Sequence, residues 1–184
     1  NTLKLLPEKF SVIGFSMGGF VALKLAIEER ERVEDLVLIG TNARSVSKDR
    51  RLLLKKSISE LNSENFVLKF STSSFHSYFA KHNTTNQRYL NVIEEMVKKL
   101  GLDCLNTQTK AIVERPSLIN LLPKIKARCL IISGELDNLS TKKMNEELSN
   151  NIIDSELQYI KNSGHFVMLE EEEGFNKIIL NWLK

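Results

Sequence analysis

The stretch Gly14-Phe15-Ser16-Met17-Gly18-Gly19 decides the fold class of this 184-residue chain. An apolar run typical of a buried strand, at about residues 10–15, precedes the serine, and a run typical of a helix follows it to about residue 30. The pattern Gly-x-Ser-x-Gly between a strand and a helix predicts a tight turn that presents the serine hydroxyl at the carboxyl edge of a sheet. Ser16 is therefore the candidate nucleophile.

The glycines around Ser16 have a steric explanation. Gly14 and Gly18 are expected at positions where a Cβ atom would collide with the turn, and Gly19 is expected to let the helix begin close to the sheet. The sequence thus predicts that all three positions exclude larger residues.

A serine nucleophile needs a base, and the base needs an orienting acid. Residues 127–133 form an apolar, β-rich run, and Asp137 follows it. A second such run at residues 155–160 is followed by His165. The order Ser16, Asp137, His165 along the chain is the order expected when each residue follows a strand of this kind of sheet.

These motifs resemble those of the α/β-hydrolase family, specifically its capped, single-domain type. The resemblance runs nearly end to end and rests on residues 14–19, on Gly134 with Asp137, and on residues 164–166 with Leu169 and Glu170. The type includes esterases, meta-cleavage-product hydrolases and cofactor-free haloperoxidase-like enzymes. It implies an α/β fold, with a mostly parallel sheet flanked by helices and an inserted helical cap.

The rest of the chain fits this division. Residues 33–39 predict a second strand, and apolar strands alternating with helices predict a parallel sheet covered on both faces. We expect a catalytic core at 1–43 and 116–184 and a cap at 44–115. The expected helices are 17–30, 47–61, 64–81, 86–100, 104–114, 141–149 (capped by Ser140 or Thr141) and 171–183.

Composition favours one soluble domain. With 42% hydrophobic and 27% charged residues the chain can bury a core, and no stretch is long and apolar enough to span a bilayer. A net charge of +3 is too small to indicate nucleic-acid binding. Cys104 and Cys129 lack metal-ligand spacing and are expected to be reduced thiols. We expect a cytoplasmic protein.

The resemblance implies a serine hydrolase that acts on a small ester, thioester or related carbonyl substrate through an acyl-enzyme. His165 takes the proton of Ser16, Asp137 orients the imidazole, and the backbone N–H of Met17 donates to the oxyanion. No metal or organic cofactor is required. C–C bond hydrolysis uses the same residues. The alternative is a non-catalytic receptor, or a fragment that keeps these residues without activity.

Several other polar residues are weaker candidates. Glu135 is a second possible acid, whereas Asp35 lies early in its strand and so at the wrong edge of the sheet. Glu170–Glu173 is explained by the dipole at the start of the last helix. His76 and His82 are six residues apart, a spacing that does not suit one metal site.

Aromatic residues recur at helical spacing within the expected cap, at Phe66, Phe70, Phe75, Tyr78 and Phe79. They are typical of a packed core, and an apolar substrate pocket is the alternative.

Members of the resembling family carry several strands and helices before the nucleophile, including a second oxyanion donor. This chain reaches the nucleophile strand within about ten residues. We therefore expect it to be the C-terminal part of a longer protein. The strand at 10–15 would then expose an edge that pairs with the N-terminal segment or with another copy.

Overall fold

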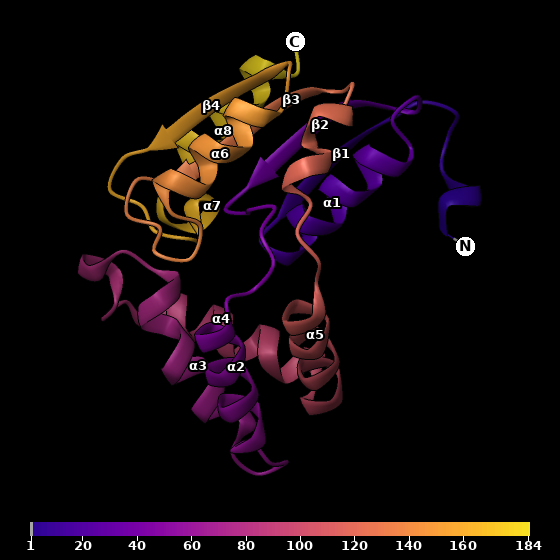
Figure 1. The fold of residues 1–184 in the computed structure, drawn as a ribbon. Coiled ribbons are helices and arrows are strands. Elements are labelled where there is room, and N and C mark those ends of the chain that lie inside the picture. The colour runs from indigo at the N-terminus through magenta and orange to yellow at the C-terminus, as the bar shows by residue number, and fades with distance from the viewer. Residues whose placement is uncertain (1) are drawn as a thin grey trace. The chain divides into compact units, whose positions relative to one another are not determined.

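The computed structural model describes residues 2–184, which form two compact units (Figure 1). The first, here called the sheet unit, joins the residues up to Ala43 with Leu118–Lys184, and the second, the helical unit, is Arg44–Ser117. The helical unit is thus an insertion between two strands of the sheet unit, and it ends two residues beyond the expected boundary at residue 115.

The sheet unit contains four parallel strands in the order β1-β2-β3-β4. Their bounds are β1 (Phe10–Phe15), β2 (Val33–Ile39), β3 (Arg128–Gly134) and β4 (Ser155–Ile160). The helices of the unit are η1 (Thr2–Leu5), α1 (Met17–Glu28), η3 (Ile119–Lys124), α6 (Lys142–Asn151), α7 (Val167–Glu170) and α8 (Glu172–Trp182). The predicted α/β fold with a parallel sheet flanked by helices is confirmed.

Alternating side chains of the central strands divide the core into two layers. Leu36 and Leu38 of β2 pack with residues of α1, η3 and α6, whereas Val37 and Ile39 pack with residues of α7 and α8. Burial of each such side chain is worth about 1.5–3 kcal/mol. The sheet is therefore covered on both faces, as Figure 1 shows.

Strand β1 lies at one end of the sheet. Phe10 and Val12 pack against the layer that contains α1, but the side chain of Ile13 is 54% exposed. Within residues 2–184, β1 pairs only with β2. Its second edge is therefore a row of backbone groups that could pair with another strand.

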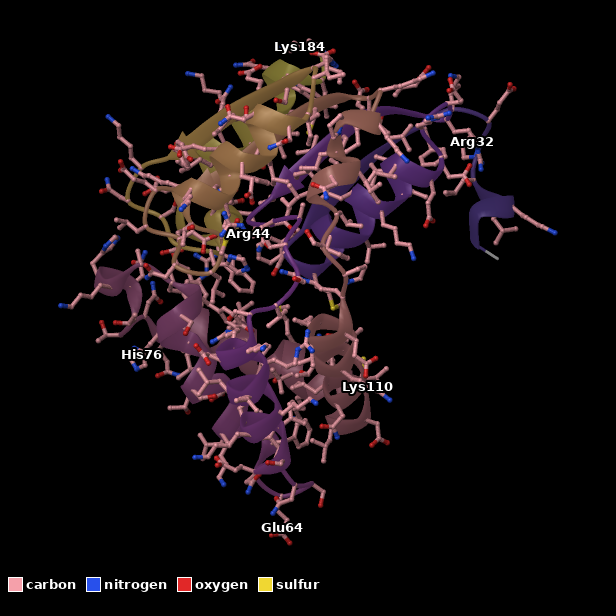
Figure 2. The ribbon with its side chains drawn as sticks, viewed as in Figure 1. Arg32, Arg44, Glu64, His76, Lys110 and Lys184 are labelled. Carbon is pink, nitrogen blue, oxygen red and sulfur yellow. The ribbon has the colours of Figure 1, made fainter. Side chains whose placement is uncertain are left out.

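Arg32 ties the segment before β1 to the sheet unit. Its Nη2 donates to the carbonyl oxygens of Leu6 at 3.1 Å and Pro7 at 2.9 Å, and its Nη1 contacts Glu29 at 3.0 Å. Figure 2 shows the Arg32 side chain beside this segment. Because a guanidinium has five donors in a fixed plane, one side chain can hold several backbone carbonyls together.

The helical unit has its own core. It contains α2 (Lys48–Ser59), α3 (Phe66–Tyr78), η2 (Lys81–Asn83), α4 (Gln87–Leu100) and α5 (Leu102–Glu114). Phe75 and Phe79 are both buried, and the Phe79 ring stacks on Tyr89 with centroids 4.9 Å apart. These two aromatic residues are thus core residues of the helical unit, whereas His76 (Figure 2) and His82 are exposed.

One helix was not predicted, and one expected cap does not form. The short helix α7 precedes α8, whereas α8 itself agrees with the expected helix at 171–183 to within one residue at each end. The expected side-chain cap of α6 does not form, because Thr141 occupies the N-cap position without a side-chain hydrogen bond and the Ser140 hydroxyl bonds elsewhere. Among residues 2–184, none of the helices combines the length and the apolar composition needed to cross a bilayer.

Candidate active site

Ser16 occupies the turn between β1 and α1 in a strained conformation. Its φ of 52° and ψ of −114° are rare for a residue with a side chain. Three hydrogen bonds fix its backbone. Its N–H donates to the Ile39 carbonyl at 2.8 Å, and its carbonyl accepts from Thr41 Oγ1 at 2.8 Å and from the Phe20 N–H at 3.3 Å. The surrounding structure therefore sets the direction of the serine side chain.

The three glycines of the turn differ in their surroundings. A Cβ atom on Gly14 would lie 2.6 Å from the Gly18 carbonyl oxygen, and one on Gly19 would lie 2.6 Å from Thr41 Cβ. A Cβ atom on Gly18 would have nothing within 4 Å. The steric explanation thus fits Gly14 and Gly19, but the prediction that Gly18 relieves a collision is wrong.

His165 joins the serine to a carboxylate. Its Nε2 lies 2.9 Å from Ser16 Oγ, and its Nδ1 lies 2.8 Å from Asp137 Oδ2. The side chains of His165 and Asp137 are 3% and 0% exposed. Phe15 packs 5.0 Å from the imidazole, measured between ring centroids. The structure therefore brings the three residues predicted from sequence into one continuous line of hydrogen bonds.

The second oxygen of Asp137 is also held. Oδ1 accepts from the backbone N–H groups of Leu139 at 2.7 Å and Ser140 at 2.9 Å. One oxygen of the carboxylate thus anchors the loop after β3, here called the acid loop (residues 135–141), and the other oxygen faces His165. This division fixes the carboxylate in a single orientation.

The acid loop and the histidine loop (residues 161–166) meet at Gly134. A Cβ atom at this position would lie 2.0 Å from the Gly164 carbonyl oxygen and 2.3 Å from that of Ser163. The Gly164 N–H donates to Glu170 Oε1 at 2.7 Å. Close backbone contact at Gly134 therefore brings the acid and the base within reach of each other.

The other polar candidates have structural partners. Glu135 pairs with Lys142 at 3.1 Å, and Asp35 pairs with Arg128 at 3.0 Å. Glu170 ends α7 and bonds to the histidine loop, so it does not lie at the start of the last helix, where the helix-dipole explanation placed it. Glu172 and Glu173 do lie in the first turn of α8, as that explanation requires.

Two further predictions concern the oxyanion and the cysteines. Met17 is the first residue of α1, and the N–H groups of a first turn have no partner within their own helix.

Cys104 and Cys129 are free thiols, and burial raises the pKa of Cys129 to about 12. Within residues 2–184, no group of three or more His, Cys, Asp or Glu side chains is arranged to hold a metal ion.

Three buried polar residues near this site were not predicted to belong to it, namely Thr41, Ser140 and Asn145. Each is at most 3% exposed. Asn145 shares one face of α6 with the buried residue Leu148. A polar residue at an apolar position of a helix was the signal that could have revealed it.

Known proteins are similar to this chain in sequence and in fold. A 2-hydroxy-6-oxononadienedioate/2-hydroxy-6-oxononatrienedioate hydrolase of Escherichia coli (strain K12) is 27% identical over an alignment of 188 positions, gaps included, that covers 95% of this chain and 62% of that protein. A pimeloyl-(acyl-carrier protein) methyl ester esterase of Legionella pneumophila (strain Corby) is 49% identical over 47 residues, 26% of this chain and 20% of that protein. The chain spans about two thirds or less of the length of these curated relatives.

Solved structures give the same fold. An esterase from Thermogutta terrifontis superposes with a TM-score of 0.85 and 24% identity, over 100% of this chain and 67% of that one. The enol-lactonase from Burkholderia xenovorans LB400 superposes with a TM-score of 0.84 and 22% identity, over 99% of this chain and 67% of that one.

The family model described as serine aminopeptidase, S33 matches residues 5–172. This span contains Ser16, Asp137 and His165 together with all four strands of the sheet. Because the match covers most of the length of this chain, the chain belongs to the serine aminopeptidase S33 family of α/β-hydrolases.

Proposed function

We propose that the protein is a serine hydrolase that acts on an ester, thioester or related carbonyl compound through an acyl-enzyme. The observation that carries this proposal is the line of hydrogen bonds from Asp137 through His165 to Ser16, with distances of 2.8 Å and 2.9 Å. A nucleophile, a base and an orienting acid in hydrogen-bond contact are the arrangement that activates a serine hydroxyl.

In the first half-reaction, Ser16 Oγ attacks the substrate carbonyl carbon while its proton passes to His165 Nε2. The imidazole, oriented by Asp137 at Nδ1, then gives that proton to the leaving group as the bond to the carbonyl carbon breaks. In the second half-reaction, water gives a proton to His165 and attacks the ester formed on Ser16. The acid product leaves, and Ser16 Oγ regains its proton.

The negative charge that forms on the carbonyl oxygen needs donors. The N–H of Met17, at the positive end of α1, is the donor we assign from this chain. One such donor contributes about 10² to 10³ in turnover. Met17 therefore acts through its backbone, and substitution of its side chain should have little effect on this step.

The names of the relatives support a carbonyl substrate, since they include a methyl ester esterase and a dienedioate hydrolase. The same nucleophile, base and acid serve ester hydrolysis and C–C bond hydrolysis in different proteins. These three residues thus indicate the type of catalysis but not the substrate. We assign the selection of substrate to the helical insertion. We propose that residues 44–115 act as a cap that forms the substrate pocket.

Labelling with a fluorophosphonate probe tests the proposal. The probe should modify Ser16, and both Ser16→Ala and His165→Ala should lose labelling and hydrolysis of p-nitrophenyl acetate to a similar extent, because such residues act as a unit. Ser155→Ala is a suitable control. Ser155 begins β4, at the opposite end of that strand from His165, and its hydroxyl donates to the Ser149 carbonyl of α6.

Labelling that survives Ser16→Ala would show that the nucleophile is another residue. An unlabelled, folded wild-type protein would favour a non-catalytic receptor or an inactive fragment.

A further inference from the structure

Behind the carboxylate of Asp137 lies a cluster of buried polar side chains that the proposed reaction does not use. Thr41, Ser133, Ser140 and Asn145 are 3%, 0%, 1% and 0% exposed. They come from four places in the chain: the loop after β2, strand β3, the acid loop and helix α6. Burial of polar groups is unfavourable unless they are hydrogen-bonded, so the contacts within the cluster need an explanation.

Ser140 is the centre of this cluster. Its Oγ donates to the Thr41 carbonyl at 2.6 Å, and its own carbonyl accepts from Asn145 Nδ2 at 2.8 Å and from Ser133 Oγ at 3.3 Å. Asn145 Nδ2 also donates to the Thr141 carbonyl at 3.0 Å. The acid loop is therefore held at Ser140 from three directions.

Two residues of the cluster also form hydrogen bonds directly with Asp137 and Ser16. The Ser140 N–H donates to Asp137 Oδ1 at 2.9 Å, and Thr41 Oγ1 donates to the Ser16 carbonyl at 2.8 Å. A path of hydrogen bonds thus runs from the acid through Ser140 and Thr41 to the nucleophile turn. This path does not pass through His165.

We propose that Ser140, Thr41 and Asn145 are positioning residues that hold the acid loop in register with the nucleophile turn. A base placed between an acid and a nucleophile can bond to both only when their separation is fixed, because misplacement by about 1 Å can cost about 10² in rate. The second path fixes that separation independently of the imidazole. The proposal rests on the proposed function, since its main readout is the reactivity of Ser16.

A merely structural role predicts something different. If the cluster only stabilised the fold, loss of the Ser140 hydroxyl would lower the melting temperature and leave the reactivity of the folded protein unchanged. A positioning role requires a loss of reactivity in protein that remains folded. Stability and reactivity must therefore be measured on the same variants.

The main experiment compares Ser140→Ala with Ser155→Ala. Each variant removes one hydroxyl that donates to a backbone carbonyl, at 2.6 Å and 2.9 Å, but Ser155 lies at the amino end of β4. We expect Ser140→Ala to lower the second-order rate constant for labelling of Ser16 by a factor between about 10 and about 10². Ser155→Ala should leave this rate constant within about twofold. Equal rate constants in the two variants would overturn the proposal.

A double-mutant cycle with Asp137→Asn tests the route of the effect. If Ser140 acts through the acid, Ser140→Ala should have no further effect on labelling once Asp137 is Asn. Losses that multiply would mean that Ser140 acts on Ser16 by another route, which contradicts the proposal.

Thr41 provides a second test if Ser140→Ala does not fold. Thr41→Val removes the bond to the Ser16 carbonyl and should lower labelling, whereas Thr41→Ser keeps the hydroxyl and should restore it. Failure of the serine variant to restore labelling would count against the proposal.

A third readout separates the positioning proposal from the proposed function. The low-field proton resonance of His165 Nδ1–H, identified by its loss in His165→Ala, reports the bond to Asp137 whether or not Ser16 reacts. It should move in Ser140→Ala and stay in place in Ser155→Ala. A protein that is not labelled but shows this shift would refute the hydrolase and retain the positioning role, and an unmoved resonance would refute the positioning role.

Discussion

Gly14 and Gly18 occupy equivalent places in the Gly-x-Ser-x-Gly pattern, yet they should respond in opposite ways to alanine. In Gly14→Ala the new Cβ atom would lie 2.6 Å from the Gly18 carbonyl oxygen, 2.7 Å from Gly19 Cα and 2.8 Å from Ala22 Cβ. Two of these three atoms belong to the backbone, which cannot turn away as a flexible side chain can. The turn that carries Ser16 must therefore shift.

The structure indicates the size of both effects. Overpacking of a well-packed site costs about 1–3 kcal/mol, and the backbone contacts place Gly14→Ala near the upper end of that range. For a chain of this length, about 3 kcal/mol corresponds to a fall of roughly 6–12 °C in melting temperature. Gly18→Ala meets nothing within 4 Å in the first turn of α1. It should stabilise the helix by up to about 1 kcal/mol.

Thermal unfolding and fluorophosphonate labelling of both variants provide the assay. We expect Gly14→Ala to melt lower and to label slowly, and Gly18→Ala to melt at the wild-type temperature or higher and to label at nearly the wild-type rate. A loss of stability in Gly18→Ala as large as that in Gly14→Ala would refute the steric reasoning.

Three other predictions follow from features of the two units. Because burial raises the pKa of Cys129 to about 12, little thiolate forms at pH 8, and iodoacetamide should modify the partly exposed Cys104 first; equal rates by mass spectrometry would contradict this. The open edge of β1 should cause the 184-residue chain to self-associate, and Ile13→Lys should raise the monomer fraction in light scattering. A monomeric wild-type chain would argue against this use of the edge. Exchange of residues 44–115 for the cap of another α/β-hydrolase should change substrate preference and preserve labelling of Ser16, and an unchanged preference across a substrate panel would show that this segment does not select substrate.

The elements of the sheet unit were accessible from sequence because each strand is a short apolar run next to a turn residue. Strand β2 was predicted at its observed bounds, and β3 was predicted one residue too early because Gly134 reads as a turn although it still pairs with Ile160. The short helix α7 was not predicted, because its four residues are too few to show a helical period. Local patterns thus locate long elements better than short ones.

The candidate site shows where local reasoning ends. The positions of Ser16, Asp137 and His165 follow from motifs next to strands, and the structure brings their side chains together. Ser140 was one of two residues predicted to cap α6, the other being Thr141, because a serine before a helix commonly caps it. Its actual partner, the Thr41 carbonyl, lies 99 residues away in sequence. A contact that depends on the packing of distant elements leaves no mark in the neighbouring residues.

The separation of the site residues along the chain has a consequence for biosynthesis. Ser16 and His165 are 149 residues apart. Ribosomes add about 5–20 residues per second, so Ser16 is made roughly 7–30 s before His165. If Ser16 reacts as proposed, the growing chain carries an ordinary hydroxyl during that interval, and reactivity should begin only when β4 has joined the sheet and brought His165 to the carboxyl edge. The onset of probe labelling during translation would then report when the fold is complete.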